Sequence, residues 1–268
     1  MSEIDDLAER LSDQRMDATW QTIGDNLDQI PVDALVEGLN QTTRRIHGVT
    51  AANFSLITDG DWREAVMHLR AGRRWLSAIE RELDLPRLKA YFQMLLDTGE
   101  PLADRVAAMA YGLSMVPRES AHDLSLEFVH FRTPRHVPLM SQWVYSWKTG
   151  TGALPYLMEF TNTPGLDGKD RFSAFGADCD ELALRLKALD VTLKDRGLNR
   201  WGAYSLDVVL AYLYSDYLYK MYFTTSKSVF STIPTVFGVM AHLLGLSIPR
   251  EAVPTGVAIE TPGEGWMD

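Results

Sequence analysis

The spacing of apolar residues is the feature that most constrains the fold of this chain. Along much of the sequence these residues recur every three or four positions, and no segment shows a sustained alternation of apolar and polar residues. A half-buried β-strand needs that alternation, whereas a spacing of three or four places side chains on one face of a helix. The sequence therefore predicts an all-α, multi-helix globular domain.

The clearest helix is predicted from Asp61 to Leu85, where one face carries Trp62, Val66, Leu69, Leu76, Ile79 and Leu83. Proline and glycine positions predict further helices over residues 86–99, 101–113, 178–196, 205–223 and 226–248, the last of them broken or started by Pro234. Another is expected from Ser120 to Phe131. Residues 133–175 are rich in proline and glycine, which indicates short helices among ordered loops.

Charge is distributed unevenly along the chain. The formal net charge is −10, and residues 1–40 carry −8 of it because they contain 10 acidic and 2 basic residues. We therefore expect an acidic helical arm over residues 1–48, followed by a main α-helical domain over residues 49–268. The negative balance disfavours non-specific nucleic-acid binding, which needs clustered lysine and arginine.

The cellular compartment is inferred from cysteine and from the N-terminus. Cys179 is the single cysteine, so no disulfide can form within the chain, and the flanking Asp178 and Asp180 disfavour a reactive thiolate. The N-terminus lacks the basic start and apolar run of a secretory signal. We expect a cytoplasmic protein.

Residues 229–248 contain no charged side chain and are about as long as a bilayer span of ~20 residues. Pro234, Gly238 and Gly245 interrupt this segment, and its flanks carry little positive charge. We interpret it as a buried core helix and do not expect membrane contact. A helix at a partner interface is the alternative, because periodicity does not distinguish the two.

Four arginines form a regular series in the predicted helix over residues 61–85. Arg63, Arg70, Arg74 and Arg81 are spaced by seven, four and seven residues, which places them on one face opposite the apolar one. Guanidinium groups bind carboxylates and phosphates bidentately. The series is interpreted either as a solvated face or as a docking surface for an acidic protein, with nucleic acid as a third hypothesis.

Two Glu-x-x-His pairs, Glu119–His122 and Glu127–His130, lie within twelve residues. In di-iron bundles such pairs come from different helices. Here they share one predicted helix and are rotated by about 80° from each other, so they do not easily converge. The doublet His122-Asp123 is also similar to that of metal-dependent helical phosphohydrolases. The candidate metal ligands are His122, Asp123, Glu127 and His130. We nevertheless expect that no cofactor is bound and that the histidines lie at the surface or at helix ends.

Tyrosines crowd the predicted helix over residues 205–223, where they point in all directions. Tyrosine combines a large apolar area with a hydrogen-bonding tip and is common at interfaces. We expect Tyr212 and Tyr219 to contact a protein partner or a second copy of the chain. Asp207, near the start of the helix, suits the helix dipole and is the candidate catalytic residue.

Two stretches resemble a known family. The segment Phe131-Arg-Thr-Pro134-Arg-His-Val-Pro138 is similar to a Phe-x-x-Pro-x-x-x-Pro segment of helix-hairpin-helix DNA glycosylase-like proteins. Residues 197–210, with Leu206-Asp207, resemble the helix-opening Leu-Asp segment of that group. The resemblance implies an all-helical fold around an interhelical cleft, with Asp207 near the cleft.

The sequence departs from that family in three respects. We find no glycine hairpin of the kind that binds the DNA backbone and no catalytic lysine, and Ser141 stands where an acidic residue is expected. The resemblance therefore implies the fold and does not by itself imply the function.

Three functional hypotheses follow from the sequence. The first is a non-catalytic accessory protein that binds a protein partner through aromatic and apolar helices. The second is a DNA glycosylase-like nucleic-acid binder or enzyme. The third is a helical metal-dependent hydrolase or oxidase that uses the segment from His122 to His130.

Overall fold

The computed structural model describes residues 17–50, 58–160, 178–223 and 235–247. Within these ranges the chain is helical and contains no β-strand, only one isolated bridge between Ser146 and Thr151. The all-α prediction is confirmed. The helices are α2 (Asp17–Asp28), α3 (Val32–Thr50), α4 (Asp59–His68), α5 (Arg70–Glu82), α6 (Leu85–Leu96), α7 (Leu102–Gly112), α8 (Arg118–Arg132), α9 (Ala153–Phe160), α10 (Asp178–Asp195), α11 (Ser205–Leu218) and α12 (Val236–Leu243), with a 3₁₀ turn η3 (Gly202–Tyr204) and a π-helical turn η4 (Tyr219–Phe223).

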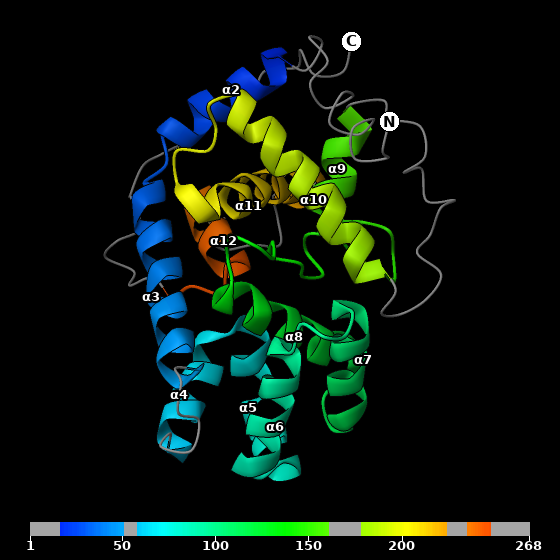
Figure 1. The fold of residues 1–268 in the computed structure, drawn as a ribbon. Coiled ribbons are helices and arrows are strands. Elements are labelled where there is room, and N and C mark those ends of the chain that lie inside the picture. Colours follow the sequence, from blue (N-terminus) through cyan, green and yellow to red (C-terminus); the bar gives the residue numbers. More distant parts are fainter. Residues whose placement is uncertain (1–16, 51–57, 161–177, 224–234, 248–268) are drawn as a thin grey trace.

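The helices form two groups that meet in the middle of the molecule. Helix α8 packs against α5, α6 and α7, and α11 packs against α9, α10 and α12, while α3 contacts both α8 and α11. Figure 1 shows α8 near the centre, with α4 to α7 on one side of it and α9 to α12 on the other. A polar residue on the faces of α8 and α11 that meet α3 therefore lies near the junction of the two groups.

The predicted helix over residues 61–85 is wrong in one respect. Its apolar face is buried, as expected, and Trp62 stacks on Phe92 with ring centroids 5.0 Å apart. However, Leu69 has extended backbone angles, so that α4 ends before it and α5 begins after it. The two helices pack against each other, and Arg63 of α4 forms an ion pair of 3.4 Å with Glu80 near the end of α5.

Helices α2 and α3 belong to the same core as the rest of the chain. Trp20, Ile23 and Leu27 of α2 are buried in that core, and α3 runs through residue 48, the predicted boundary of an N-terminal arm. Asn26 of α2 also donates a hydrogen bond of 2.8 Å to the hydroxyl of Tyr212 on α11. Residues 17–48 are thus part of the main domain, and residues 1–16 lie outside the described residues.

Within the described residues, the last helix ends at Leu243, before the predicted end at residue 248. Helix α12 begins after Thr235, whose hydroxyl accepts a hydrogen bond from the backbone N–H of Gly238. Most of its apolar side chains are buried, among them Phe237 and Met240, which identifies the described part as a core helix. Residues 226–234 of the predicted helix lie outside the described residues. Within the described ranges, no helix combines the length and apolar character that crossing a membrane requires.

Candidate functional site

Helix α8 carries polar side chains into the core. His122, Asp123, Ser125, Glu127 and His130 are each at most 5% exposed. The two histidines are therefore not at the surface, although His130 lies in the last turn of α8 and thus at a helix end, as expected. A buried polar group is costly unless it is hydrogen-bonded or paired. The partners of these side chains consequently define what α8 can do.

His130 of α8 and Asp207 of α11 form a buried pair between the two helical groups. The Nε2 atom of His130 lies 3.2 Å from Oδ2 of Asp207, and both side chains are at most 1% exposed. The Nδ1 atom of His130 donates to the carbonyl oxygen of Val137 at 2.9 Å, which requires a proton on Nδ1. The contact between Nε2 and Oδ2 is within ion-pair distance but does not have hydrogen-bond geometry, and it joins an imidazolium to a carboxylate when Nε2 also carries a proton.

The electrostatic environment favours this charged form of His130. Burial alone lowers the pKa of an imidazole, but the negative charge of Asp207 opposes it, with support from the Val137 carbonyl and from Glu127. The net result is a raised pKa for His130. The Asp207 carboxylate is thus held against a positive charge.

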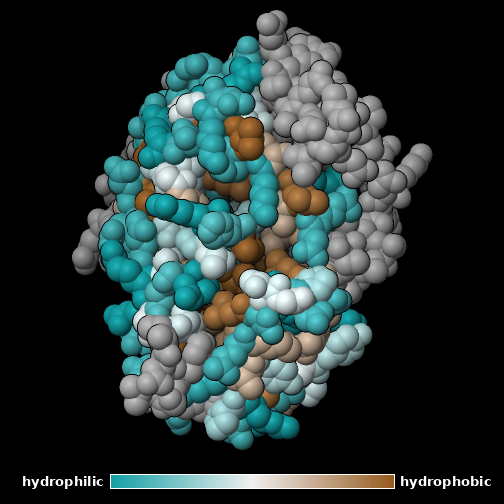
Figure 2. Space-filling model, in the orientation of Figure 1, coloured by the Kyte–Doolittle hydropathy of each residue, from teal (hydrophilic) through white to brown (hydrophobic). Residues whose placement is uncertain are grey.

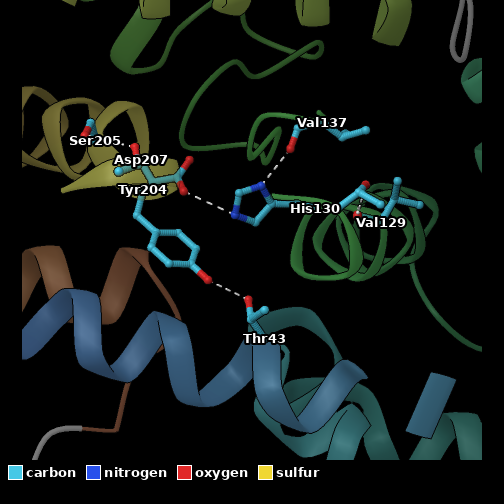
Figure 3. A network of polar contacts seen from close by, with 9 residues as sticks. Thr43, Val129, His130, Val137, Tyr204, Ser205 and Asp207 are labelled. Carbon is cyan, nitrogen blue, oxygen red and sulfur yellow. Dashed lines mark hydrogen bonds and ion pairs between the residues drawn. The ribbon is translucent and has the colours of Figure 1, made fainter. Parts of the chain in front are cut away.

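Neighbouring groups fix the position of this pair (Figure 3). Tyr204 of η3 donates a hydrogen bond of 2.7 Å to Oγ1 of Thr43 on α3, and its ring lies 6.3 Å from that of His130. The hydroxyl of Ser205 accepts from the backbone N–H of Trp201 and donates to the carbonyl of Gly202. These bonds shape the turn that opens α11 and carries Asp207.

Two adjoining hollows lie beside the buried pair. The first, of about 320 Å³, is lined by Leu206 and Asp207 together with residues of α10 and of the segment after α8. The second, of about 570 Å³, extends to α3. Both hollows are lined by Pro134, Arg135, His136, Gly202 and Ala203, and we call the two together the Asp207 groove. The face seen in Figure 2 is hollowed, with apolar residues at the bottom and hydrophilic residues at the edges.

The Asp207 groove has a basic lining. The groove is lined by two acidic residues, Asp190 and Asp207. It is lined by four basic residues, Arg132, Arg135, Lys187 and Lys194. Asp190 is paired with Lys194 at 2.6 Å, and Asp207 is paired with His130. The groove is therefore locally positive in a chain whose net charge is −10.

Glu127 has a different partner, the first turn of α5. Its Oε2 atom accepts a hydrogen bond of 3.1 Å from the backbone N–H of Ala71. Leu69, at the N-cap position of α5, provides no side-chain cap, so the carboxylate of another helix takes that place. Burial raises the pKa of Glu127 to about 7, although the bond to Ala71 and the charge of Arg70 act in the opposite direction.

Asp123 and His122 also have partners of their own. Asp123 accepts from the backbone N–H of Gln142 at 3.1 Å, and burial together with Glu127 raises the pKa of Asp123 to about 8. The Nε2 atom of His122 lies 3.7 Å from Sγ of Cys179, and burial lowers the pKa of His122 to about 4. Within the described residues, no group of three or more His, Cys, Asp or Glu side chains is placed to hold a metal ion.

The break at Leu69 divides the arginine series, with Arg63 on α4 and with Arg70, Arg74 and Arg81 on α5. Arg63 is paired with Glu80, and Arg81 donates to the carbonyl of Ser77 on its own helix. Arg70 and Arg74 instead line a separate cavity. The series is thus divided between two helices, and its role as a docking surface stays a prediction.

The tyrosines predicted to contact a partner are placed differently. Tyr212 is 5% exposed and accepts the hydrogen bond from Asn26, so it packs inside the chain. Burial raises the pKa of Tyr219, which is partly buried against the core. Of the two, only Tyr219 has accessible surface that a partner could contact.

The sequence identified the polar residues of this site but not their partners. Ala71 and Val137 contribute main-chain groups, which carry no signal in the residue type. The pairing of His130 with Asp207 joins residues that lie 77 positions apart in the sequence. No protein-family model, curated protein or solved structure matches this chain.

Proposed function

We propose that the chain binds nucleic acid along the Asp207 groove and hydrolyses a bond there, with Asp207 as the general base. One observation carries the proposal: a buried imidazolium–carboxylate pair borders a hollow whose edges are basic. Replacing a buried ion pair by apolar residues often leaves the stability of the folded protein unchanged or increases it. Stability alone is thus a weak reason for a carboxylate at this position.

The geometry gives the two residues of the pair different roles. Asp207 is among the residues that line the hollow, but its side chain is only 1% exposed, so the proposed role requires the hollow to open far enough to bring water to the carboxylate. His130 is fully buried and acts through Asp207, which makes it a positioning residue. In the reaction that the glycosylase-like resemblance implies, a C–O bond forms between water and a sugar carbon as the C–N bond to the nucleobase breaks. The nucleobase leaves with the bonding electrons and takes a proton from solvent, while the carboxylate takes the proton of the attacking water.

The charge distribution is compatible with a polyanionic ligand. The negative balance of the chain resides mainly in residues 1–40, which carry −8 of the −10. Lys187 and Lys194 of α10 are exposed at the edge of the hollow, and Arg135 is exposed on the segment opposite. Such a cluster binds phosphates and releases counterions.

Binding is tested first, by fluorescence anisotropy of labelled single-stranded and duplex oligonucleotides at low and rising salt. We expect salt-sensitive binding that is weakened at least tenfold when Lys187 and Lys194 are both changed to Glu. The matched control changes the exposed Arg81 and Arg87 to Glu, which alters the net charge equally outside the groove. Absence of binding at low salt, or equal losses in the two double variants, would rule out the groove.

Catalysis is tested separately with Asp207→Asn. This variant keeps the shape of the side chain but removes the base, so we expect unchanged oligonucleotide affinity and loss of hydrolysis by about a hundredfold or more. The substrates are oligonucleotides that each contain one modified base, and the measurement is strand cleavage after alkali. Equal activity of Asp207→Asn and the unaltered chain contradicts the role of Asp207.

A second candidate function is self-association through α10. Leu184 and Val191 are 44% and 49% exposed, and a separation of seven residues places them on the same helix face. A second copy of the chain covering this face would bury both side chains. Light scattering is expected to show a dimer that becomes monomeric when both residues are changed to Glu, and a monomeric unaltered chain disproves this candidate.

A further inference from the structure

Another cavity, of about 380 Å³, lies where α5 begins and α12 ends, beside the first turns of α8. Pockets for small molecules usually have volumes of about 300–1,000 Å³. The walls that matter for its chemistry are formed by Arg70, Arg73, Arg74, Trp75, Asp123 and His242. The cavity does not include Asp207 or any other residue of the Asp207 groove.

The cavity contains positive charge that acidic groups do not balance. Three arginines from the first turns of α5 line it, and its one acidic residue is Asp123. Because burial raises the pKa of Asp123 to about 8, this carboxyl is largely neutral at neutral pH. His242 responds to the same environment: burial lowers its pKa, and the charges of Arg70 and Arg73 lower it further.

Among the three arginines, Arg70 is the one available for a ligand. Arg73 donates to the carbonyl of Gly245 and, at 2.6 Å, to the hydroxyl of Ser247. Arg74 lies over the ring of Trp75, 5.5 Å from its centroid. The partly buried guanidinium of Arg70 forms no hydrogen bond or ion pair with any residue that the structure describes.

The N-terminus of α5 does not need an anion in this cavity to satisfy the N–H group of Ala71. Its Ala71 N–H already donates to Glu127, so the helix terminus has a carboxylate of its own. Asp123 and Glu127 act on the Arg70 guanidinium electrostatically, but neither lies within ion-pair distance of it, so no hydrogen bond within the described residues replaces the hydration that it loses on partial burial. A bound oxyanion compensates for that loss through two parallel hydrogen bonds.

We propose that this cavity binds a small soluble molecule carrying a phosphate group, with Arg70 as its main ligand. Arg73 adds positive charge around the phosphate, and His242, whose pKa is lowered, contributes a neutral imidazole that can donate a hydrogen bond. The ring of Trp75 provides a flat apolar wall for the remainder of the molecule. This site is independent of the proposed nucleic-acid groove, since the two have no lining residue in common.

Isothermal titration calorimetry of the full chain with inorganic phosphate and with phenyl phosphate tests the proposal. We expect both to bind, phenyl phosphate more tightly because of Trp75. Arg70→Gln is expected to weaken both at least about tenfold, since it removes a charge-assisted pair of hydrogen bonds. The matched control is Arg63→Gln, which removes one charge at the exposed Arg63–Glu80 pair and should leave both affinities unchanged.

Further variants distinguish binding in this cavity from binding in the Asp207 groove or at a lipid surface. Trp75→Leu should reduce the affinity for phenyl phosphate to that for phosphate, a test that stands even if Arg70→Gln fails to fold. Lys187→Glu with Lys194→Glu should leave phosphate binding intact. Absence of phosphate binding, equal losses in Arg70→Gln and Arg63→Gln, or binding confined to vesicles that contain phosphatidic acid overturns the proposal.

Discussion

At the scale of single residues, α8 shows how little a residue type reveals about its role. The Glu-x-x-His spacing indicated metal ligands, yet Glu127 caps α5 and His130 pairs with Asp207. Both carboxylates are stabilised by groups that lie far away in the sequence. The candidate residues could be selected from the sequence by their Glu-x-x-His spacing, but their burial and their partners depend on the packing of the helices.

The buried pair can be tested by a change in one partner. His130→Leu leaves the Asp207 carboxylate buried without its counter-charge, and breaking such a pair costs about 3–5 kcal/mol of unfolding free energy. We expect a loss of this size in urea denaturation followed by circular dichroism. The combined change His130→Leu with Asp207→Asn should recover part of the loss, because the unpaired charge is gone. A double variant as unstable as the sum of the single variants argues against a coupled pair.

At the scale of elements, apolar periodicity predicted which faces are buried but not where the helices break. The face containing Trp62, Leu69 and Leu76 is buried as predicted. No proline lies near Leu69 that would have predicted the break between α4 and α5. Its evidence is Gly72, where a Cβ atom would lie 2.3 Å from the carbonyl oxygen of Val66. The backbones of α4 and α5 approach too closely there for any side chain.

Gly72→Ala should therefore destabilise the chain, although alanine is the better helix former. We expect a loss of about 2–3 kcal/mol or more in unfolding free energy, because the clash is with backbone and cannot be relieved by a side-chain rotation. Gly48→Ala in α3 is the matched control, since nothing lies within 4 Å of its Cβ position. Alanine there should be neutral or stabilise by up to about 1 kcal/mol. Comparable effects at the two positions would disprove the close contact.

At the scale of the whole molecule, the sequence predicted the all-α class from periodicity alone. It did not predict the two helical groups or the way α3 bridges them, because long-range contacts leave no periodic signal. Their junction is lined by ionisable groups, and the stability of the molecule should therefore depend on pH.

Asp123 has the largest predicted effect on this dependence. Its pKa is about 8 in the folded chain against 3.8 ordinarily, so the folded state keeps a proton that the unfolded state loses. The contribution of Asp123 to the free energy of unfolding is complete below about pH 4, and it is lost as the pH rises through about 8. Glu127, which contacts the same region, acts in the same direction with a pKa of about 7, while Arg70 partly offsets both.

Urea denaturation of the unaltered chain and of Asp123→Asn between about pH 5 and 9 isolates this effect. The unaltered chain should lose stability relative to the variant as the pH rises to about 8, and the difference should then level off. His122 has a lowered pKa and so contributes a loss of stability on the acid side, but it does so equally in both proteins. Parallel pH profiles would show that Asp123 ionises normally.

The bond between Glu127 and Ala71 has a consequence for exchange with solvent deuterium. The amide hydrogens in the first turn of a helix usually face water, and they exchange with solvent when that turn frays. The Ala71 amide instead donates to a carboxylate at the centre of the molecule. Its hydrogen leaves only when α5 separates from α8, so the lifetime of this one hydrogen measures how often the interior opens.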